Sequence, residues 1–312
     1  MTSIRSTASR RRFSGAGRPW VPYAFVAPFV IVFVVFLVAP IVVGVVNSLY
    51  SRQSSGLGFG GSSIDFVGFD NFIRAFADTD FLLGFPKVLL YGAIQVPVMM
   101  IIAAGLALLF DSALVKAKRF FQFAVFLPYA VPSVIAALLW GFLYQPSVSP
   151  ILQFFSSIGI DLDLLGPGVI WWSIGNINLW SLIGINMIIL FSALQSVPRE
   201  MYEAARIDGA GEVRTALQIK LPMITPALLL TTLSSVIGTL QLFNEPQVLQ
   251  SITSNIPSDF TPNMAIYAAS TLGKDANLSS AMAVILGVAT LIVSLLLLAV
   301  NKRNAKGATD GI

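Results

Sequence analysis

The chain has 312 residues, of which 56% are hydrophobic and only 11% are charged, and its formal net charge is +4. A soluble domain usually carries roughly 25% charged residues, so this composition excludes a soluble enzyme and a disordered protein. The sequence contains no Cys and no His. That absence excludes a disulfide framework, Cys or His catalysis and the common zinc sites. The composition therefore predicts an all-α integral membrane protein without a metal site.

A helix that crosses the hydrocarbon core of a bilayer needs about 20 mostly apolar residues. Six stretches of the chain meet this requirement and predict six transmembrane helices. The predicted spans are 21–49, 85–110, 121–143, 168–194, 226–249 and 280–300. They divide the chain into four predicted regions. These regions are an N-terminal tail (1–20), a first helix with an external loop (21–83), a five-helix transmembrane domain (84–300) and a C-terminal tail (301–312).

Most of the 19 basic residues fall on one side of these spans. They occur in the two tails, in the loop between the second and third spans, and in the loop between the fourth and fifth. The other side holds only Arg52, Arg74, Lys87 and Lys274. Because cytoplasmic loops carry the excess of Lys and Arg, both termini are expected to be cytoplasmic. The basic charge is therefore a signal of topology, and no nucleic-acid partner is expected.

The predicted cytoplasmic loop 195–225 is longer than the usual helix connection of about 2–8 residues. Pro198 suits the first turn of a helix, and Gly209 and Gly211 suit its end. A second short amphipathic helix is expected to follow and to stop at Pro222. Two short helices of this kind can bury their apolar faces only against a partner. The alternative is a solvated connector that binds nothing.

Within this loop, Glu203-Ala204-Ala205-x-x-Asp208-Gly209-Ala210, followed by Ile219-x-Leu221-Pro222, resembles the EAA motif of binding-protein-dependent ATP-binding-cassette (ABC) importers. Four further segments resemble the maltose-type carbohydrate permeases of that family. They are Asn178-x-Trp180, Leu194-x-x-Val197-Pro198-x-Glu200-x-Tyr202, Gln241-x-Phe243-Asn244 and Phe66-Val-Gly68-Phe-Asp70-Asn71-Phe72. After the fifth span, this chain has residues 249–257 where that branch usually has a Gly-Gly-Pro turn.

The resemblance implies the type I ABC importer transmembrane fold and a permease subunit that passes carbohydrate from a binding protein to the cytoplasm. It implies a second homologous permease, two ABC ATPase subunits and a lipid-anchored or periplasmic sugar-binding protein, in a bacterial or archaeal cytoplasmic membrane. The chain itself is expected to bind no cofactor and to catalyse no reaction, since ATP and Mg would bind to the partner ATPases. The residues expected to couple to an ATPase are Glu203, Ala204, Ala205, Asp208, Gly209 and Ala210.

Polar side chains inside membrane helices are candidates for a substrate pathway, because they are costly in lipid unless they face the interior of the bundle. At 1.5 Å per residue, Asn178 lies roughly 15 Å from the outer end of its span, and Ser235 lies roughly 14 Å from the cytoplasmic end of its own. The two spans therefore bring polar groups to one level near the midplane. The predicted pathway residues are Asn178, Trp180, Ser235, Thr239, Gln241, Asn244 and Glu245, with Glu245 expected at the outer rim.

Several alternatives remain open at this point. Asn176, Asn178 and Asn186 would also suit hydrogen bonds between helices, and Ser235 and Thr239 would suit close helix packing. A permease for another polar solute, such as glycerol phosphate, would favour a basic side chain along the pore. An ion-coupled secondary transporter would show ionisable residues deep in the membrane.

Overall fold

The structure, a computed structural model, describes residues 20–54, 62–112, 115–273 and 275–309. It divides into two compact units, Met1–Val46 and Asn47–Ile312. Of the predicted N-terminal tail only Trp20 is described, and the predicted C-terminal tail is described as far as Thr309. The region boundaries at residues 83 and 300 stay predictions.

The first unit is a long apolar helix. Its described part comprises α1 (Val21–Phe33), the π-helical turn η1 (Val34–Val38) and most of α2 (Ala39–Ser48), whose last two residues belong to the second unit. No side chain of α1 or η1 is buried against protein, as expected of a segment whose solvent is lipid. The wide turn lies just before Pro40, whose ring and missing N–H disturb the regular hydrogen-bond ladder.

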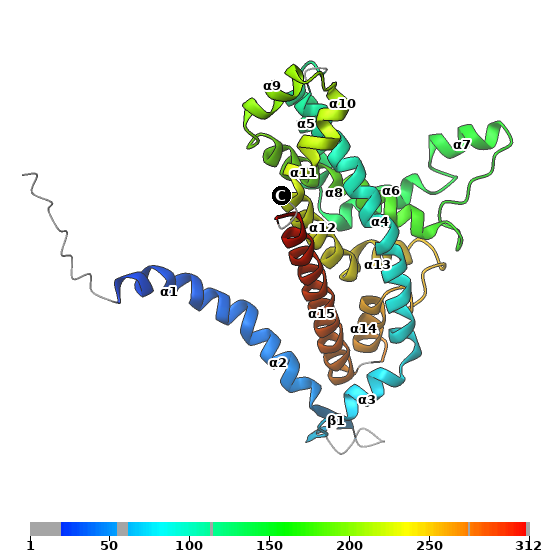
Figure 1. The fold of residues 1–312 in the computed structure, drawn as a ribbon. Coiled ribbons are helices and arrows are strands. Elements are labelled where there is room, and N and C mark those ends of the chain that lie inside the picture. The colour runs from blue at the N-terminus through cyan, green and yellow to red at the C-terminus, as the bar shows by residue number, and fades with distance from the viewer. Residues whose placement is uncertain (1–19, 55–61, 113–114, 274, 310–312) are drawn as a thin grey trace, which may run out of the picture. The chain divides into compact units, whose positions relative to one another are not determined.

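The second unit begins with a two-stranded antiparallel hairpin and continues as helices (Figure 1). The strands are β1 (Tyr50–Ser54) and β2 (Ser62–Phe66), with Tyr50 opposite Phe66. The helices in chain order are α3 (Asp70–Ala77), α4 (Thr79–Asp111), α5 (Lys118–Phe126), η2 (Leu127–Ala130), α6 (Ser133–Leu143), α7 (Pro150–Ser157), α8 (Ile170–Leu194), α9 (Arg199–Ile207), α10 (Glu212–Thr215), η3 (Ala216–Lys220), α11 (Leu221–Met223), α12 (Thr225–Leu240), α13 (Asn244–Gln250), α14 (Pro262–Thr271) and α15 (Ala276–Thr309).

Five segments of the described chain are long and apolar enough to cross a membrane. They are Val21–Ser48, Thr79–Asp111, Ile170–Leu194, Thr225–Gln250 and Ala276–Ala299. The remaining predicted span, 121–143, is present as two helices with a sharp bend between them. Lys118–Ala130 and Ser133–Leu143 meet at 97°, because Pro132 is extended and lacks the N–H that would continue the helix. This bent pair supplies the sixth apolar segment.

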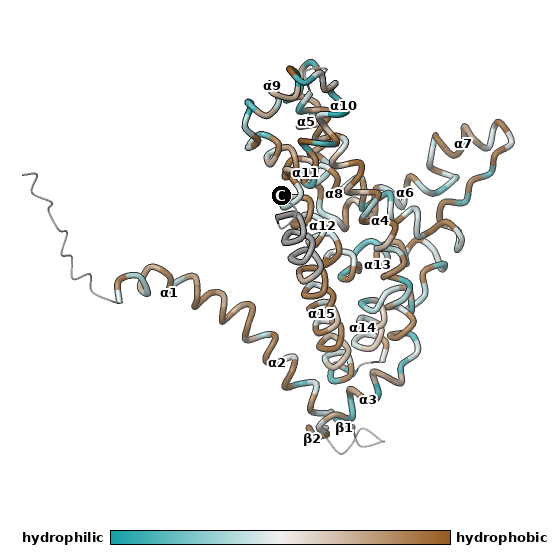
Figure 2. Tube along the Cα trace, viewed as in Figure 1, coloured by the Kyte–Doolittle hydropathy of each residue, from teal (hydrophilic) through white to brown (hydrophobic). Residues whose placement is uncertain are grey.

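The helix α4 is the centre of the second unit and packs against α8, α12 and α14. Figure 2 colours each residue along the chain by its hydropathy and shows that hydrophobic residues predominate along α4. Two glycines allow close packing at these crossings. A Cβ on Gly84 would lie 2.5 Å from the backbone nitrogen of Pro262, and a Cβ on Gly184 would lie 2.3 Å from the carbonyl oxygen of Val125. These contacts fix α4 against α14, and α8 against α5.

The predicted fifth span is also interrupted, because α12 ends at Leu240 and α13 begins at Asn244. The chain turns between them, and α13 packs against α6 and α8. Pro222, which was expected to stop the second loop helix, lies one residue before the end of the continuous helical segment Glu212–Met223.

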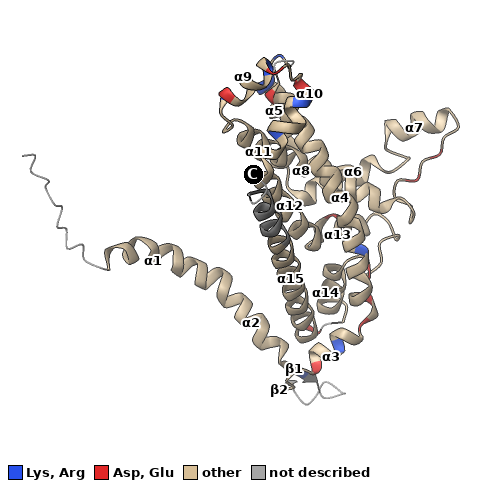
Figure 3. Ribbon diagram, viewed as in Figure 1, with Lys and Arg blue, Asp and Glu red and all other residues tan. Residues whose placement is uncertain are grey.

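Charged side chains gather toward the two ends of the second unit, and the middle of α12 and α15 is free of them (Figure 3). At the end that carries the hairpin, Arg74 pairs with Asp275 at 2.7 Å. Asn71 donates hydrogen bonds to the carbonyl oxygens of Ser48 and Tyr50, at 2.9 and 2.8 Å. Asn71 therefore joins α3 to the hairpin, which gives this residue of the 66–72 segment a structural role.

Residues 249–257, which replace the Gly-Gly-Pro turn, are held by packing. Ile256 is buried, and Asn255 donates a hydrogen bond to the carbonyl oxygen of Leu165 at 2.9 Å. Just beyond them, the ring of Phe260 stacks on Trp171 with ring centroids 3.9 Å apart. The loop therefore has a defined conformation without glycine.

Candidate functional site

The loop between α8 and α12 folds into the short helix α9, a tight turn and the continuous segment α10–η3–α11. Gly209 has φ of +74°, a backbone conformation that favours glycine. The N–H of Ala210 donates to the carbonyl oxygen of Ala205 at 2.9 Å, and the N–H of Gly209 donates to that of Arg206 at 3.1 Å. This is a Schellman motif, which ends α9 sharply.

The six predicted coupling residues lie on α9 and this turn. Ala205 is buried against the chain, whereas Glu203, Ala204, Asp208 and Gly209 are exposed and Ala210 is half-buried. The same surface carries exposed apolar side chains, since Ile207 is 86% exposed and Val213 is 73% exposed. The loop therefore presents a mixed polar and apolar surface that nothing in the described chain covers.

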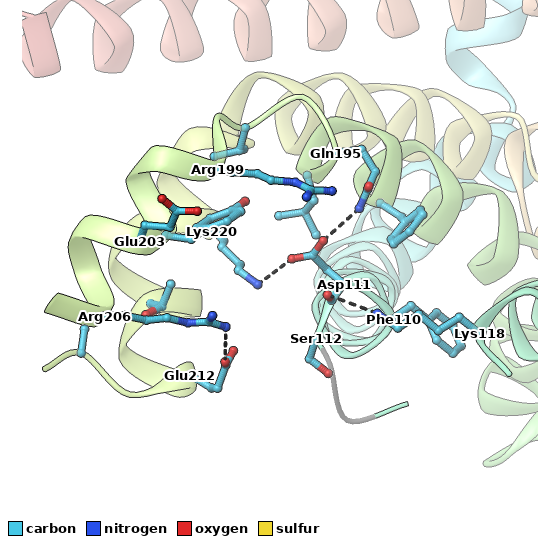
Figure 4. Close-up of a pocket in the computed structure, with 16 residues that line it drawn as sticks. Phe110, Asp111, Ser112, Lys118, Gln195, Arg199, Glu203, Arg206, Glu212 and Lys220 are labelled. Carbon is cyan, nitrogen blue, oxygen red and sulfur yellow. Dashed lines mark hydrogen bonds and ion pairs between the residues drawn. The ribbon is translucent and has the colours of Figure 1, made fainter. Parts of the chain in front are cut away.

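Beneath α9 lies a cavity of about 600 Å³ (Figure 4). Lys220 and Asp111 form an ion pair there, with 2.5 Å between Nζ and Oδ2. Gln195 donates a hydrogen bond to the other carboxylate oxygen of Asp111 at 2.9 Å. The three side chains come from the ends of η3, α4 and α8, so one carboxylate joins the loop to two long helices.

A second cavity of about 500 Å³ lies among α4, α8, α12 and the start of α13. Amide, hydroxyl and aromatic side chains line much of it, and Glu245 is its one charged side chain among the described residues. The polar lining residues that matter here are Tyr91, Gln95, Tyr129, Ser133, Asn178, Asn186, Ser234, Ser235, Thr239, Gln241, Asn244 and Glu245. Such a surface suits hydrogen bonds to a neutral, hydroxyl-rich molecule.

Six of the seven predicted pathway residues line this cavity, and Trp180 does not. Trp180 packs instead on Trp140, with ring centroids 5.9 Å apart. Since successive helix residues are about 100° apart, Asn178 and Trp180 point about 160° away from each other on α8. Trp180 therefore lies on a different face of α8 from this cavity, and its role in a substrate pathway stays a prediction.

Glu245 was expected at the outer rim, on the assumption of a straight fifth helix. The break after Leu240 places it in the first turn of α13, only 9% exposed and in the wall of the same cavity as Asn178. A helix N-terminus favours a negative charge at that position. The break thus places the carboxylate in the wall of this cavity, and its depth in the membrane stays a prediction.

The asparagines of α8 also bond between elements, as the packing alternative anticipated. Asn178 donates to the hydroxyl of Tyr91 at 2.9 Å, and Asn176 donates to that of Tyr144 at 2.8 Å. Asn178 therefore both lines the cavity and bridges α8 to α4. Thr239 donates to the carbonyl oxygen of Ser235 within its own helix at 2.9 Å.

Sequence analysis missed Tyr91, Gln95, Asp111 and Lys220. Gln95 is a buried polar residue within a membrane helix and donates to the carbonyl oxygen of Gly175 at 2.9 Å. Its position alone could have made it a candidate. No sequence pattern relates Asp111 to Lys220, because their proximity depends on the tertiary packing of helices far apart in the chain.

The family described as "binding-protein-dependent transport system inner membrane component" matches residues 99–308. The sn-glycerol-3-phosphate transport system permease protein UgpA of Salmonella typhi is 31% identical over 278 residues, which cover 88% of this chain and 92% of that protein.

The fold is similar to that of a bacterial ABC transporter involved in the import of the acidic polysaccharide alginate. The TM-score is 0.78 at 23% identity, covering 92% of this chain and 96% of the other. A structure of the alginate transporter with an alginate pentasaccharide-bound periplasmic protein gives a TM-score of 0.79 at 23% identity, covering 93% and 96%.

Proposed function

Because the chain belongs to the family of inner membrane components of binding-protein-dependent transport systems, we propose that it forms half of the translocation pathway of an ATP-driven carbohydrate importer. A second homologous permease completes the pathway, two ABC ATPases bind ATP and Mg in the cytoplasm, and an external binding protein delivers the sugar. The chain catalyses no reaction itself and resides in a bacterial or archaeal cytoplasmic membrane.

The cavity beside Asn178 carries this proposal. Sugar hydroxyls both donate and accept hydrogen bonds, and the amides, hydroxyls and single carboxylate of the cavity offer both kinds of partner. Among the described residues, no Lys or Arg lines it. An anionic cargo would meet Glu245 without a compensating cation from this chain, so the charge pattern favours a neutral carbohydrate.

Glycerol phosphate is the second candidate cargo, because the Salmonella typhi relative is a permease for sn-glycerol-3-phosphate. A phosphate would need a basic partner, which the second permease would then have to contribute. The two candidates thus differ in the charge that the cavity must accept.

At the cytoplasmic end, α9 and its turn form the coupling element. The exposed Glu203 and Ala204 and the apolar Ile207 contact a cleft of the ATPase, and the turn at Gly209 gives the element its shape. Closure of two ATPases on ATP moves these clefts, and the helices that carry α9 move with them. The membrane cavity is thereby opened alternately to the two sides.

Uptake into proteoliposomes that hold the whole complex and its binding protein tests the choice of cargo. Radiolabelled neutral oligosaccharides, sn-glycerol-3-phosphate and acidic oligosaccharides are compared at equal concentration. Uptake of a neutral sugar in preference to both anions supports the proposal. Preference for sn-glycerol-3-phosphate would replace the carbohydrate with the phosphate.

A further inference from the structure

The Asp111–Lys220 ion pair beneath α9 involves none of the residues that define the EAA motif, since Lys220 occupies the unspecified position of Ile219-x-Leu221-Pro222. The pair is almost completely buried. The Lys220 side chain is 8% exposed and the Asp111 side chain 11%. An ion pair removed from water in this way holds its geometry, because separating the charges would leave each of them buried without a partner. The three elements that meet at Asp111 are therefore fixed to one another.

The coupling helix has few contacts with the rest of the chain. Within α9, which is fully described, only Ala205 is buried, and the helix packs only weakly against other elements. Tyr202 also faces inward, where it packs on the buried cluster that contains Phe110, Leu194 and Val197, and its ring centroid lies 5.0 Å from Nζ of Lys220. A cation over an aromatic face is attracted to it, so the ion pair also retains α9 through this ring.

The environment of Tyr202 fits that role. Its hydroxyl is buried and has no hydrogen-bond partner among the described residues. Burial raises the pKa of this hydroxyl, and the negative charge of Asp111 raises it further. The phenol therefore stays neutral, and its ring remains a face for the Lys220 cation.

From Asp111 the connection continues along one helix. The helix α4 carries Asp111 at its cytoplasmic end and Met99, Gln95 and Tyr91 in the wall of the membrane cavity. Pro97 lies within α4 between Gln95 and Met99 and removes one hydrogen bond of the helix. The stretch from Met99 to Asp111, about 18 Å long, contains no proline, so a displacement of α9 that is held at Asp111 reaches the cavity wall at Met99.

We propose that Asp111 and Lys220 are positioning residues that join the coupling helix to α4 and so transmit ATPase closure to the membrane cavity. This inference rests on the proposed coupling role of α9. Asp111 and Lys220 lie outside the surface that α9 presents to the ATPase. The pair therefore transmits movement once the ATPase has bound and takes no part in binding it.

The test uses the whole complex in proteoliposomes with Asp111→Asn, Lys220→Gln and the reversed pair Asp111→Lys with Lys220→Asp. The single variants are expected to retain co-purified ATPase and ATP hydrolysis. Uptake per ATP hydrolysed is expected to fall by between about 2-fold and 30-fold, the range for residues that carry coupling between sites, and the reversed pair is expected to restore part of it. Glu212→Gln is the matched control, because it breaks the exposed Arg206–Glu212 pair of the same loop and should leave the ratio unchanged.

A distance measurement tests the same inference without any cargo. Since the chain has no Cys, spin labels on Met201→Cys in α9 and Leu109→Cys in α4, both on exposed side chains, report one distance. It should stay constant between nucleotide-free and ATP-bound complexes, and should broaden or shift when Asp111→Asn is added.

Unchanged uptake per ATP and an unchanged label distance in the single variants would overturn the inference. Loss of the ATPase from those variants would also overturn it, since the pair would then serve assembly and not transmission. Failure of the unmodified complex to couple ATP hydrolysis to any uptake would instead refute the proposed function.

Discussion

Asn178 combines a packing contact with a place in the wall of the membrane cavity, where we propose that the cargo binds. It bridges α8 to α4 through the hydroxyl of Tyr91 at 2.9 Å, and it lines the membrane cavity. An amide has two donor hydrogens and an acceptor oxygen, so the bond to Tyr91 leaves capacity for a bound sugar. Substitution can separate the two roles.

Asn178→Leu is expected to weaken apparent cargo affinity by about 3-fold to 10-fold, the worth of a lost hydrogen bond, while the ATPase still co-purifies. Asn176→Leu is the control, since Asn176 lies on the same helix but lines a different cavity. Uptake kinetics with both variants measure the effect. Dissociation of the complex by Asn178→Leu alone would instead assign Asn178 to packing.

Glycine is required at position 209 by its left-handed backbone conformation. Space is not the reason, since a Cβ at this position would meet no atom within 4 Å. Gly209→Val is expected to cost about 1–2 kcal/mol in the left-handed conformation and to abolish transport with normal membrane insertion. Gly211→Val is the matched control, since Gly211 is equally open but has an extended backbone with φ of −72°. Transport by the Gly209 variant equal to that of the control would remove the turn from the coupling element.

At the scale of elements, the bundle depends on close helix crossings. Gly184→Ala forces a methyl group against the backbone of α5 and is expected to destabilise the protein by about 1–3 kcal/mol. Gly105→Ala in α4 meets open space and should not destabilise it. Thermal unfolding in detergent compares the two variants, and equal midpoints would contradict the packing of α8 on α5.

The sequence predicted the apolar spans well, because length and hydropathy alone decide whether a helix suits a bilayer. It did not predict the 97° bend around Pro132 or the break after Leu240. Proline can continue, kink or end a membrane helix, and neighbouring helices decide which. The break affects the site, since it places Glu245 in the first turn of α13 and in the cavity wall.

At the scale of the whole molecule, the family predicted from the EAA motif is confirmed by the match over residues 99–308. Most of the predicted pathway residues line one cavity. Polar residues at one membrane depth on neighbouring helices avoid lipid by facing the interior of the bundle, and there they meet. The orientation of Trp180 could not be predicted from its depth along the helix, since depth does not determine which face of α8 a residue occupies. The Asp111–Lys220 pair could be recognised only in the folded chain.

The topology follows from the distribution of basic residues and can be tested on the intact chain. A cysteine at Val213, which is exposed on the loop, should react with an impermeant reagent only from the cytoplasm. A cysteine at Ile64 in the hairpin, also exposed, should react only from outside. The unmodified chain has no Cys and gives the background. Labelling of both positions from one side would contradict the assigned orientation.

The central claim is that this chain couples an ATPase to the passage of a cargo delivered by a binding protein. Its most direct test is ATP hydrolysis by the purified complex in lipid nanodiscs, with the binding protein added empty or loaded. The account predicts that the ATPases co-purify with the chain and that the loaded binding protein stimulates hydrolysis. Purification of a folded chain without any ATPase, or hydrolysis indifferent to the binding protein, would contradict it.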